Sequence, residues 1–231
     1  MPRPIQARIN LAALRHNYLI AKKNASVHYP AAKAWAVLKA DAYGHGLLRT
    51  ANALSSLADG FALLDLDDAV ALREAGIRQP ILLLEGFFEP DDLELCAEYG
   101  LIPSVHRLEQ LQMIRLAALP VRLPVYLKFN SGMNRLGFTQ AQLPAVQAEL
   151  EKSSAIASIA LMTHFANADD PLGVDWQLER FAEMRAGWFG RSDFAITMAN
   201  SAAGWSRTPV AGRITGGGAR CSCSVPRPGA G

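Results

Sequence analysis

Cysteine is scarce in this chain of 231 residues, which contains only three copies. Cys96 stands alone in an amphipathic segment, and Cys221 and Cys223 lie near the C-terminus. A disulfide-stabilised domain or a zinc site needs more cysteines, or cysteines and histidines at short fixed spacings. The sequence therefore predicts neither a disulfide framework nor a metal site.

Long hydrophobic runs and clusters of like charge are also absent. No apolar stretch approaches the roughly 20 residues that span a bilayer, and residues 1–10 lack the apolar centre of a signal peptide. The formal net charge is +2, with the basic residues scattered along the chain, so nucleic acid is not an expected partner. We expect a cytoplasmic protein with no membrane partner.

Apolar runs of strand length alternate with helical patterns through most of the chain. Asn10 is placed to cap a first helix that runs to about Ala25. Segments such as "LDDAVALREAG" and "EPDDLELCAEYG" are amphipathic and carry acidic residues in the first turn, as helices do. The predicted strands are Trp35–Leu38, Phe61–Leu64, Ile81–Leu84, Leu101–Val105, Val121–Phe129, Ile156–Met162 and Phe194–Met198.

This alternation predicts an α/β fold with a parallel sheet, because each strand is followed by a crossover helix. Seven such units fit a (β/α)8 barrel better than a doubly wound sheet. No G-x-G-x-x-G turn follows the first strand, which disfavours a dinucleotide-binding fold. The pattern stops near Arg213, where an eighth strand is due, so we expect a barrel that is incomplete at its last strand.

Polar side chains follow several of the predicted strands, at the end of the barrel where active sites of this fold lie. The first strand leads to Lys39 and Tyr43, and the sixth leads to His164. The fifth strand ends at Lys128 and is followed by Arg135, and the seventh is followed by Asn200 and Ser201.

No acidic pair or Ser-His-Asp arrangement accompanies these residues, so they do not resemble a hydrolase site. They suit an aldehyde cofactor that carries a phosphate. A lysine withdrawn from water can form a Schiff base, and a serine at the start of a helix can bind a phosphate.

Each residue also has an ordinary structural interpretation. Lys39 can be a strand-end lysine that reaches solvent, and a lone His164 is commonly a hydrogen-bonded structural histidine. Asn200 and Ser201 can simply cap a helix, while Arg135 and Lys128 can be surface charges. Only the arrival of all of them at successive strand ends favours a binding site.

Four segments resemble alanine racemases, in the same order along the chain. The segment "AVLKADAYGHG" at 36–46 is similar to the pyridoxal-phosphate attachment motif of that family. The other three segments are "KFNSGMNRLGF" at 128–138, "THFANAD" at 163–169 and "ANSAA" at 199–203. The resemblance extends from Ile5 to about Arg213.

The resemblance implies a barrel that binds pyridoxal 5'-phosphate and interconverts L-alanine and D-alanine, which supplies D-alanine for peptidoglycan. Lys39 would carry the cofactor as a Schiff base and then act as the base facing the D-side Cα proton. Arg135 would reach the phenolic oxygen of the cofactor and the substrate, and His164 would lie under the pyridine ring. The lysine at the position of Lys128 can be carbamylated in the family. Contacts to the cofactor phosphate would come from Tyr43 and Ser201, with Asn200 beside them.

The resemblance also implies parts that this sequence does not contain. Alanine racemases form homodimers in which a β-rich C-terminal domain supplies a catalytic tyrosine to the partner's barrel. The "W-x-R-P-G" segment expected after the seventh strand is missing as well. We therefore divide the chain into residues 1–10, which would pair with the β-rich domain, a barrel over 11–212, and an atypical tail over 213–231.

A frameshift near Arg213 is our hypothesis for this tail. Codons that encode "CSCSVPRP" permit, one base upstream, a hydrophobic run followed by Gly-Ala-Ser-Pro, which is similar to the family at that place. A chain truncated in this way would be inactive if the tyrosine domain is required. Two alternatives remain: a single-barrel pyridoxal-phosphate carrier without racemase activity, and a barrel fragment with unpaired strand edges. The preference for alanine over serine stays open.

Overall fold

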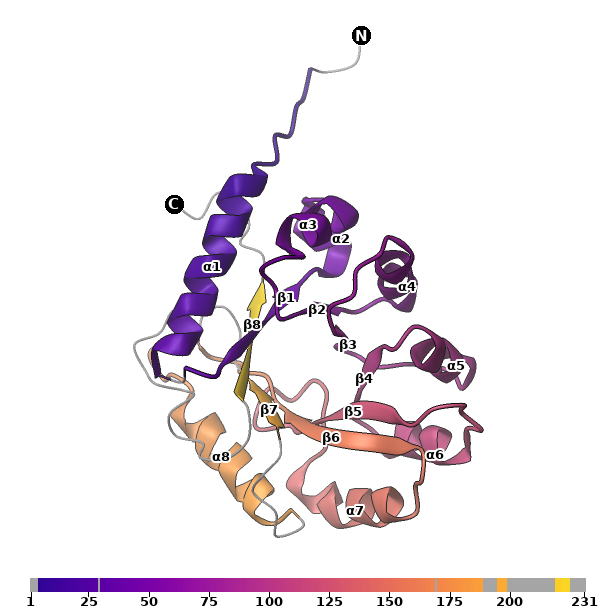
Figure 1. Cartoon of the computed structure of the whole chain (residues 1–231). Helices are drawn as coiled ribbons and strands as arrows, with labels where there is room; N and C mark the ends of the chain where they lie inside the picture. Colours follow the sequence, from indigo (N-terminus) through magenta and orange to yellow (C-terminus); the bar gives the residue numbers. More distant parts are fainter. Residues whose placement is uncertain (1–3, 29, 169, 189–194, 199–218, 225–231) are drawn as a thin grey trace.

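The computed structural model describes residues 4–28, 30–168, 170–188, 195–198 and 219–224. Eight parallel strands form a closed barrel in which each strand pairs with the next and β8 pairs with β1 (Figure 1). The strands are β1 (Lys33–Val37), β2 (Gly60–Leu63), β3 (Ile81–Leu83), β4 (Ile102–Val105), β5 (Leu123–Lys128), β6 (Ile156–Met162), β7 (Ala195–Met198) and β8 (Ala219–Ser224).

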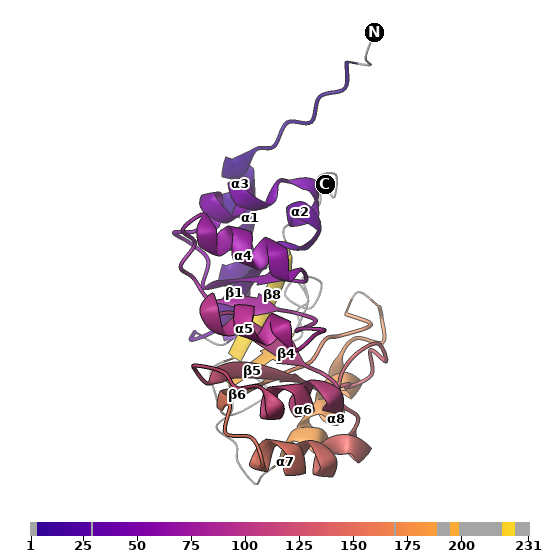
Figure 2. The same cartoon turned by 90° about the vertical axis from the view of Figure 1, so that its right-hand side faces the viewer.

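Helices cover the outside of the barrel, and Figure 2 shows α4 to α6 in front of the strands that they cover. Both views show residues 4–10 running away from the barrel before α1 begins. Among the described residues, no helix combines the length and the apolar character needed to cross a membrane. The helices are α1 (Leu11–His28), α2 (Lys39–Gly44), α3 (Leu47–Leu54), α4 (Leu66–Glu74), α5 (Asp91–Glu98), α6 (Leu108–Leu116), α7 (Leu143–Glu151) and α8 (Asp175–Ala186), with a 3-10 turn at Gln140–Gln142.

Strands β1 to β4 are mostly apolar on both faces because both faces are buried, as in other parallel sheets. One face packs under the helices, and the other fills the inside of the barrel. Trp35 and Tyr126 meet edge to face inside the barrel, with ring centroids 6.1 Å apart. The interior cluster contains Trp35, Val37, Ala62, Leu82, Tyr126, Ala160 and Met162. The barrel is therefore filled along most of its length, and a site can form only near one end.

The structure confirms the barrel and all seven predicted strands. The strand Ile156–Met162 has the predicted bounds, and the other strands differ by a few residues at their ends. Asn10 does cap α1, since its side chain accepts a hydrogen bond from the amide of Ala13 at 3.0 Å. Helix α1 continues to His28, slightly beyond the predicted end near Ala25.

Strand β8 corrects the expectation of a barrel edge left open after the seventh strand. The tail residues 219–224 pair with β7 on one side and with β1 on the other. Parallel pairing uses backbone amides and carbonyls, so an edge can be completed by a segment without an apolar run. The edges of β7 and β1 are therefore both paired, and the barrel is closed.

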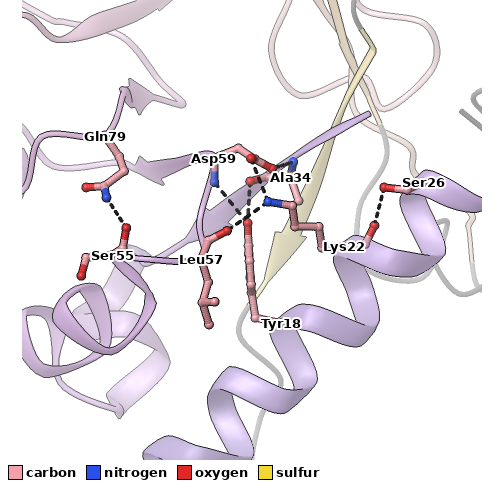
Figure 3. Close-up of polar contacts among 8 residues, drawn as sticks. All are labelled: Tyr18, Lys22, Ser26, Ala34, Ser55, Leu57, Asp59 and Gln79. Carbon is pink, nitrogen blue, oxygen red and sulfur yellow. Dashed lines mark hydrogen bonds and ion pairs between the residues drawn. The ribbon is translucent and has the colours of Figure 1, made fainter. Parts of the chain in front are cut away.

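A polar network ties α1 to the amino-terminal end of the barrel (Figure 3). The ammonium of Lys22 lies 2.8 Å from the Asp59 carboxylate and donates to the carbonyl of Leu57 at 3.0 Å. The other oxygen of Asp59 accepts the amide of Ala34 at 2.9 Å, and the Tyr18 hydroxyl donates to the Ala34 carbonyl. The charges of Lys22 and Asp59 are thus paired within the protein.

Candidate active site at the barrel mouth

A cavity of about 130 Å³ opens at the carboxyl ends of the strands. Five of the predicted site residues line it together: Lys39, Tyr43, Lys128, Arg135 and His164. They come from β1, β5 and β6 and from the segments that follow these strands, so the predicted convergence is what the structure has. Asn200 and Ser201 lie outside the described residues. The other lining residues are Val37, Leu64, Leu84, Glu85, Leu136 and Met162.

Lys39 and Tyr43 are carried by the short element α2, whose backbone forms a left-handed turn from Ala40 to Tyr43. The four residues from Ala40 to Tyr43 have φ between 52° and 56°, although none of them is glycine. A left-handed conformation costs roughly 1–2 kcal/mol for each such residue. Backbone strain of this kind persists only where the surrounding structure holds it.

The turn sets the two side chains beside each other. The Lys39 ammonium lies 5.9 Å from the centroid of the Tyr43 ring. The amide of Ala42 donates to the carbonyl of Leu38 at 2.8 Å, which anchors the turn to the end of β1. His45, in the same motif, is buried with its Nδ1 2.8 Å from the carbonyl of Ala42. Therefore His45 supports the turn and does not line the cavity.

Arg135 reaches the cavity from the tight loop that follows β5. The amide of Phe138 donates to the carbonyl of Lys128 at 2.8 Å, and the amide of Asn130 donates to the carbonyl of Phe138 at 2.9 Å. Gly137 has φ of 117°, and a Cβ there would lie 2.8 Å from the nitrogen of Asn130. This position therefore requires glycine. The closed loop returns Arg135 to the side of Lys128.

Lys128 is the most deeply buried cation of the site, with a relative exposure of 7%. Burial, together with the nearby positive charges of Arg135 and Lys39, lowers the pKa of Lys128 to about 8, while the Glu85 carboxylate acts in the opposite direction. Among the described residues, no carboxylate lies within ion-pair distance of Lys128. Cations without a partner favour an anionic ligand in this cavity.

His164 is kept neutral by its surroundings. Burial and, to a smaller extent, the positive charges of Lys128, Arg135 and Lys39 lower its pKa to about 4. Its backbone is fixed by Gln177 of α8, which donates to the His164 carbonyl at 3.4 Å and accepts the amide of Ala166 at 2.8 Å. A neutral imidazole here can face an aromatic ring without adding another positive charge.

Three comparisons with known proteins agree with this geometry. Residues 9–213 match the family model described as "Alanine racemase, N-terminal domain". The chain belongs to this family. It is 54% identical over 171 residues to the alanine racemase of Nitrosospira multiformis, covering 74% of this chain and 46% of that protein. It is 48% identical over 210 residues to that of Albidiferax ferrireducens, covering 91% of this chain and 54% of that protein.

The solved structures give the same family. The biosynthetic alanine racemase from Pseudomonas aeruginosa superimposes with a TM-score of 0.80 and 36% sequence identity. The match covers 94% of this chain and 57% of that chain. The chain thus spans about half the length of the alanine racemases that it matches.

Within this alanine racemase barrel, the sequence analysis missed Glu85. This residue follows β3 and is the only carboxylate among the described lining residues. The imidazole Nε2 of His106 lies 3.0 Å from the Glu85 carbonyl, and Gln110 also donates to that carbonyl at 3.4 Å. The available signal was its position directly after the apolar run of a strand, where Lys39 and Lys128 also lie.

Proposed function

We propose that the chain binds pyridoxal 5'-phosphate at the barrel mouth, with Lys39 as the attachment residue, and that this site serves the racemisation of alanine. The observation that carries the proposal is the convergence of Lys39, Lys128, Arg135 and His164 on one small cavity. Family membership supports the same reading. D-Alanine for peptidoglycan, produced in the cytoplasm, is the proposed product.

The residues of the cavity fit the chemical groups of this cofactor. Lys39 has the amine that forms a Schiff base with the aldehyde. Tyr43 offers a hydrogen-bond donor for the phosphate, and Asn200 and Ser201, which lie outside the described residues, are proposed to do the same. Arg135 is a guanidinium for the phenolic oxygen or for a substrate carboxylate. His164 presents a flat neutral ring. The cofactor, when bound, supplies the electron sink that makes a Cα proton of an amino acid acidic.

The protein's own part is to place groups that accept and return a proton. Lys39 is proposed to hold and move the proton on one face of the substrate. Racemisation also needs a group on the opposite face. The family resemblance assigns that group to a tyrosine of the partner subunit in a homodimer.

Lys128 is proposed to be carbamylated. Its pKa of about 8 leaves part of the amine unprotonated near neutral pH. The unprotonated amine is the form that attacks carbon dioxide; an N–C bond forms, one amine proton is released to water, and the product is a carbamate whose negative charge can pair with Arg135. An intact-mass measurement with and without bicarbonate, compared with Lys128→Met, tests this part of the proposal.

The test of the proposed function is a titration of the purified chain with pyridoxal phosphate, followed by proton NMR of alanine in deuterium oxide. We expect a visible absorption band and exchange of the alanine Cα proton, both lost in Lys39→Ala. The matched control is Lys33→Ala, at the other end of β1, which should keep both signals. A band without Cα exchange would indicate the pyridoxal-phosphate carrier. No band would contradict the proposal.

A further inference from the structure

In the left-handed turn after Lys39, the side chain of Asp41 binds a backbone group outside the turn. The carboxylate of Asp41 accepts the amide of Leu47 at 2.6 Å, and the Asp41 carbonyl accepts the amide of Gly46 at 3.0 Å. Leu47 is the first residue of α3, whose first amides have no partner within the helix. Asp41 therefore joins the turn to the start of the next helix.

Helix α3 is a firm support for such a bond. Its residues Leu47, Thr50, Ala51 and Leu54 are buried, so the helix cannot shift without disturbing the layer between barrel and helices. Asp41 is itself exposed and does not line the cavity. Its carboxylate therefore acts on the turn and not on a ligand.

The position of Asp41 in the turn connects it to the site. It lies in the sequence between Lys39 and Tyr43, whose side chains lie beside each other, with the Lys39 ammonium 5.9 Å from the centroid of the Tyr43 ring. We propose that Asp41 is a positioning residue that locks the left-handed turn against α3 and so keeps Lys39 and Tyr43 together at the barrel mouth. This inference rests on the proposed function for the identity of the ligand, and on the hydrogen bonds alone for the lock.

The test compares Asp41→Ala and Asp41→Asn with a control that loses a similar bond elsewhere. Asp92 accepts the amides of Phe88 and Glu89 at 2.9 and 3.1 Å at the start of α5, so Asp92→Ala is the matched variant. Asparagine keeps an oxygen that can accept the Leu47 amide. Asp41→Gly removes the carboxylate but adopts the left-handed conformation without strain, so it replaces Asp41→Ala if that variant does not fold.

The readouts are the dissociation constant of pyridoxal phosphate and, in the cofactor-free protein, the amide exchange of Leu47 and the acetylation rate of Lys39. For Asp41→Ala we expect binding weaker by about tenfold, with faster exchange and faster acetylation. The dissociation constant of pyridoxal phosphate in Asp41→Asn should stay within about threefold of the wild-type value, and that of Asp92→Ala should equal it.

Two results would overturn the inference. One is an Asp41→Ala protein that binds like the wild type, with unchanged acetylation of Lys39. The other is equal weakening of binding in Asp41→Ala and Asp92→Ala, which would make the effect one of general stability. If the wild type itself does not bind pyridoxal phosphate, the proposed function fails. The amide exchange of Leu47 and the acetylation rate of Lys39 then still test whether Asp41 holds the left-handed turn against α3.

Discussion

The two ends of the barrel differ in whether their partly or fully buried charged groups have a partner. At the amino-terminal end, Lys22 is paired with Asp59, which also accepts the amide of Ala34 (Figure 3). At the carboxyl end, Lys39 and Lys128 face the cavity, and within the described residues neither is in an ion pair. The first arrangement holds α1 to the barrel, whereas the second leaves charge available for a ligand.

This difference separates the part of the barrel that stabilises the fold from the part that is proposed to bind a ligand. A buried charge without a partner costs stability, and proteins retain such charges where function needs them. Removing a charge should therefore lower the free energy of unfolding at the amino-terminal end of the barrel and raise it at the carboxyl end.

The largest effect is expected at the amino-terminal end. Asp59→Ala removes the partner of the Lys22 ammonium and the acceptor of the Ala34 amide, so the free energy of unfolding should fall by about 2 kcal/mol. Urea unfolding measures it. Glu149→Ala is the control, since Glu149 pairs with Arg115 and Lys152 on the surface and should matter less. Equal losses in the two variants would contradict the distinction.

At the barrel mouth, removing a charge is expected to raise the free energy of unfolding. In buffer free of carbon dioxide, where Lys128 is not carbamylated, Lys128→Met removes a cation whose pKa is lowered by burial, so the cofactor-free protein should gain about 1 kcal/mol in free energy of unfolding. The same variant should bind pyridoxal phosphate more weakly, as a titration would show. A loss of stability would mean that Lys128 has a stabilising partner in the free protein.

In the left-handed turn, an alanine-to-glycine substitution should have a smaller effect, and it should stabilise the protein, whereas the same substitution in an ordinary helix destabilises it. Ala40 is exposed and has φ of 52°, so Ala40→Gly should raise the free energy of unfolding by about 0.5 kcal/mol. Ala148 is exposed in the interior of α7, and Ala148→Gly should lower it by about 1 kcal/mol. If both variants lose stability alike, the turn is not left-handed in solution.

The smallest effect concerns pH. The folded pKa of His164 is about 4, below the value of about 6.5 for an unfolded histidine, so the unfolded chain binds more protons between these values. Neutral His164 makes its full contribution to the free energy of unfolding above pH 6.5, and this contribution is lost as the pH falls toward 4. Unfolding measured from pH 7 to 4 should thus show a shallower decline in His164→Gln. Parallel curves would contradict the lowered pKa.

The sequence predicts the strands well because each one is a short apolar run bounded by helical patterns. It also predicts that Lys39, Lys128 and His164 lie at the barrel mouth, because each stands at or just after the end of such a run. Strand β8 escapes prediction because "ARCSCS" has no apolar run and its pairing depends on the edges of β1 and β7. The left-handed turn escapes as well, because alanine has no preference for positive φ and the bond from Asp41 spans six residues.

The frameshift near Arg213 remains a hypothesis about the DNA. Resequencing the codons from Arg213 to Pro228 tests it, since the printed frame would persist if the tail is genuine. The strand formed by residues 219–224 is compatible with either origin, because backbone pairing does not depend on which side chains the segment carries.

The most direct test of the account is to treat the pyridoxal-phosphate-loaded chain with borohydride and to map the labelled peptide by mass spectrometry. The account predicts a single label on Lys39, in the peptide that contains the left-handed turn. A label spread over surface lysines, or one on Lys128 with none on Lys39, would contradict it.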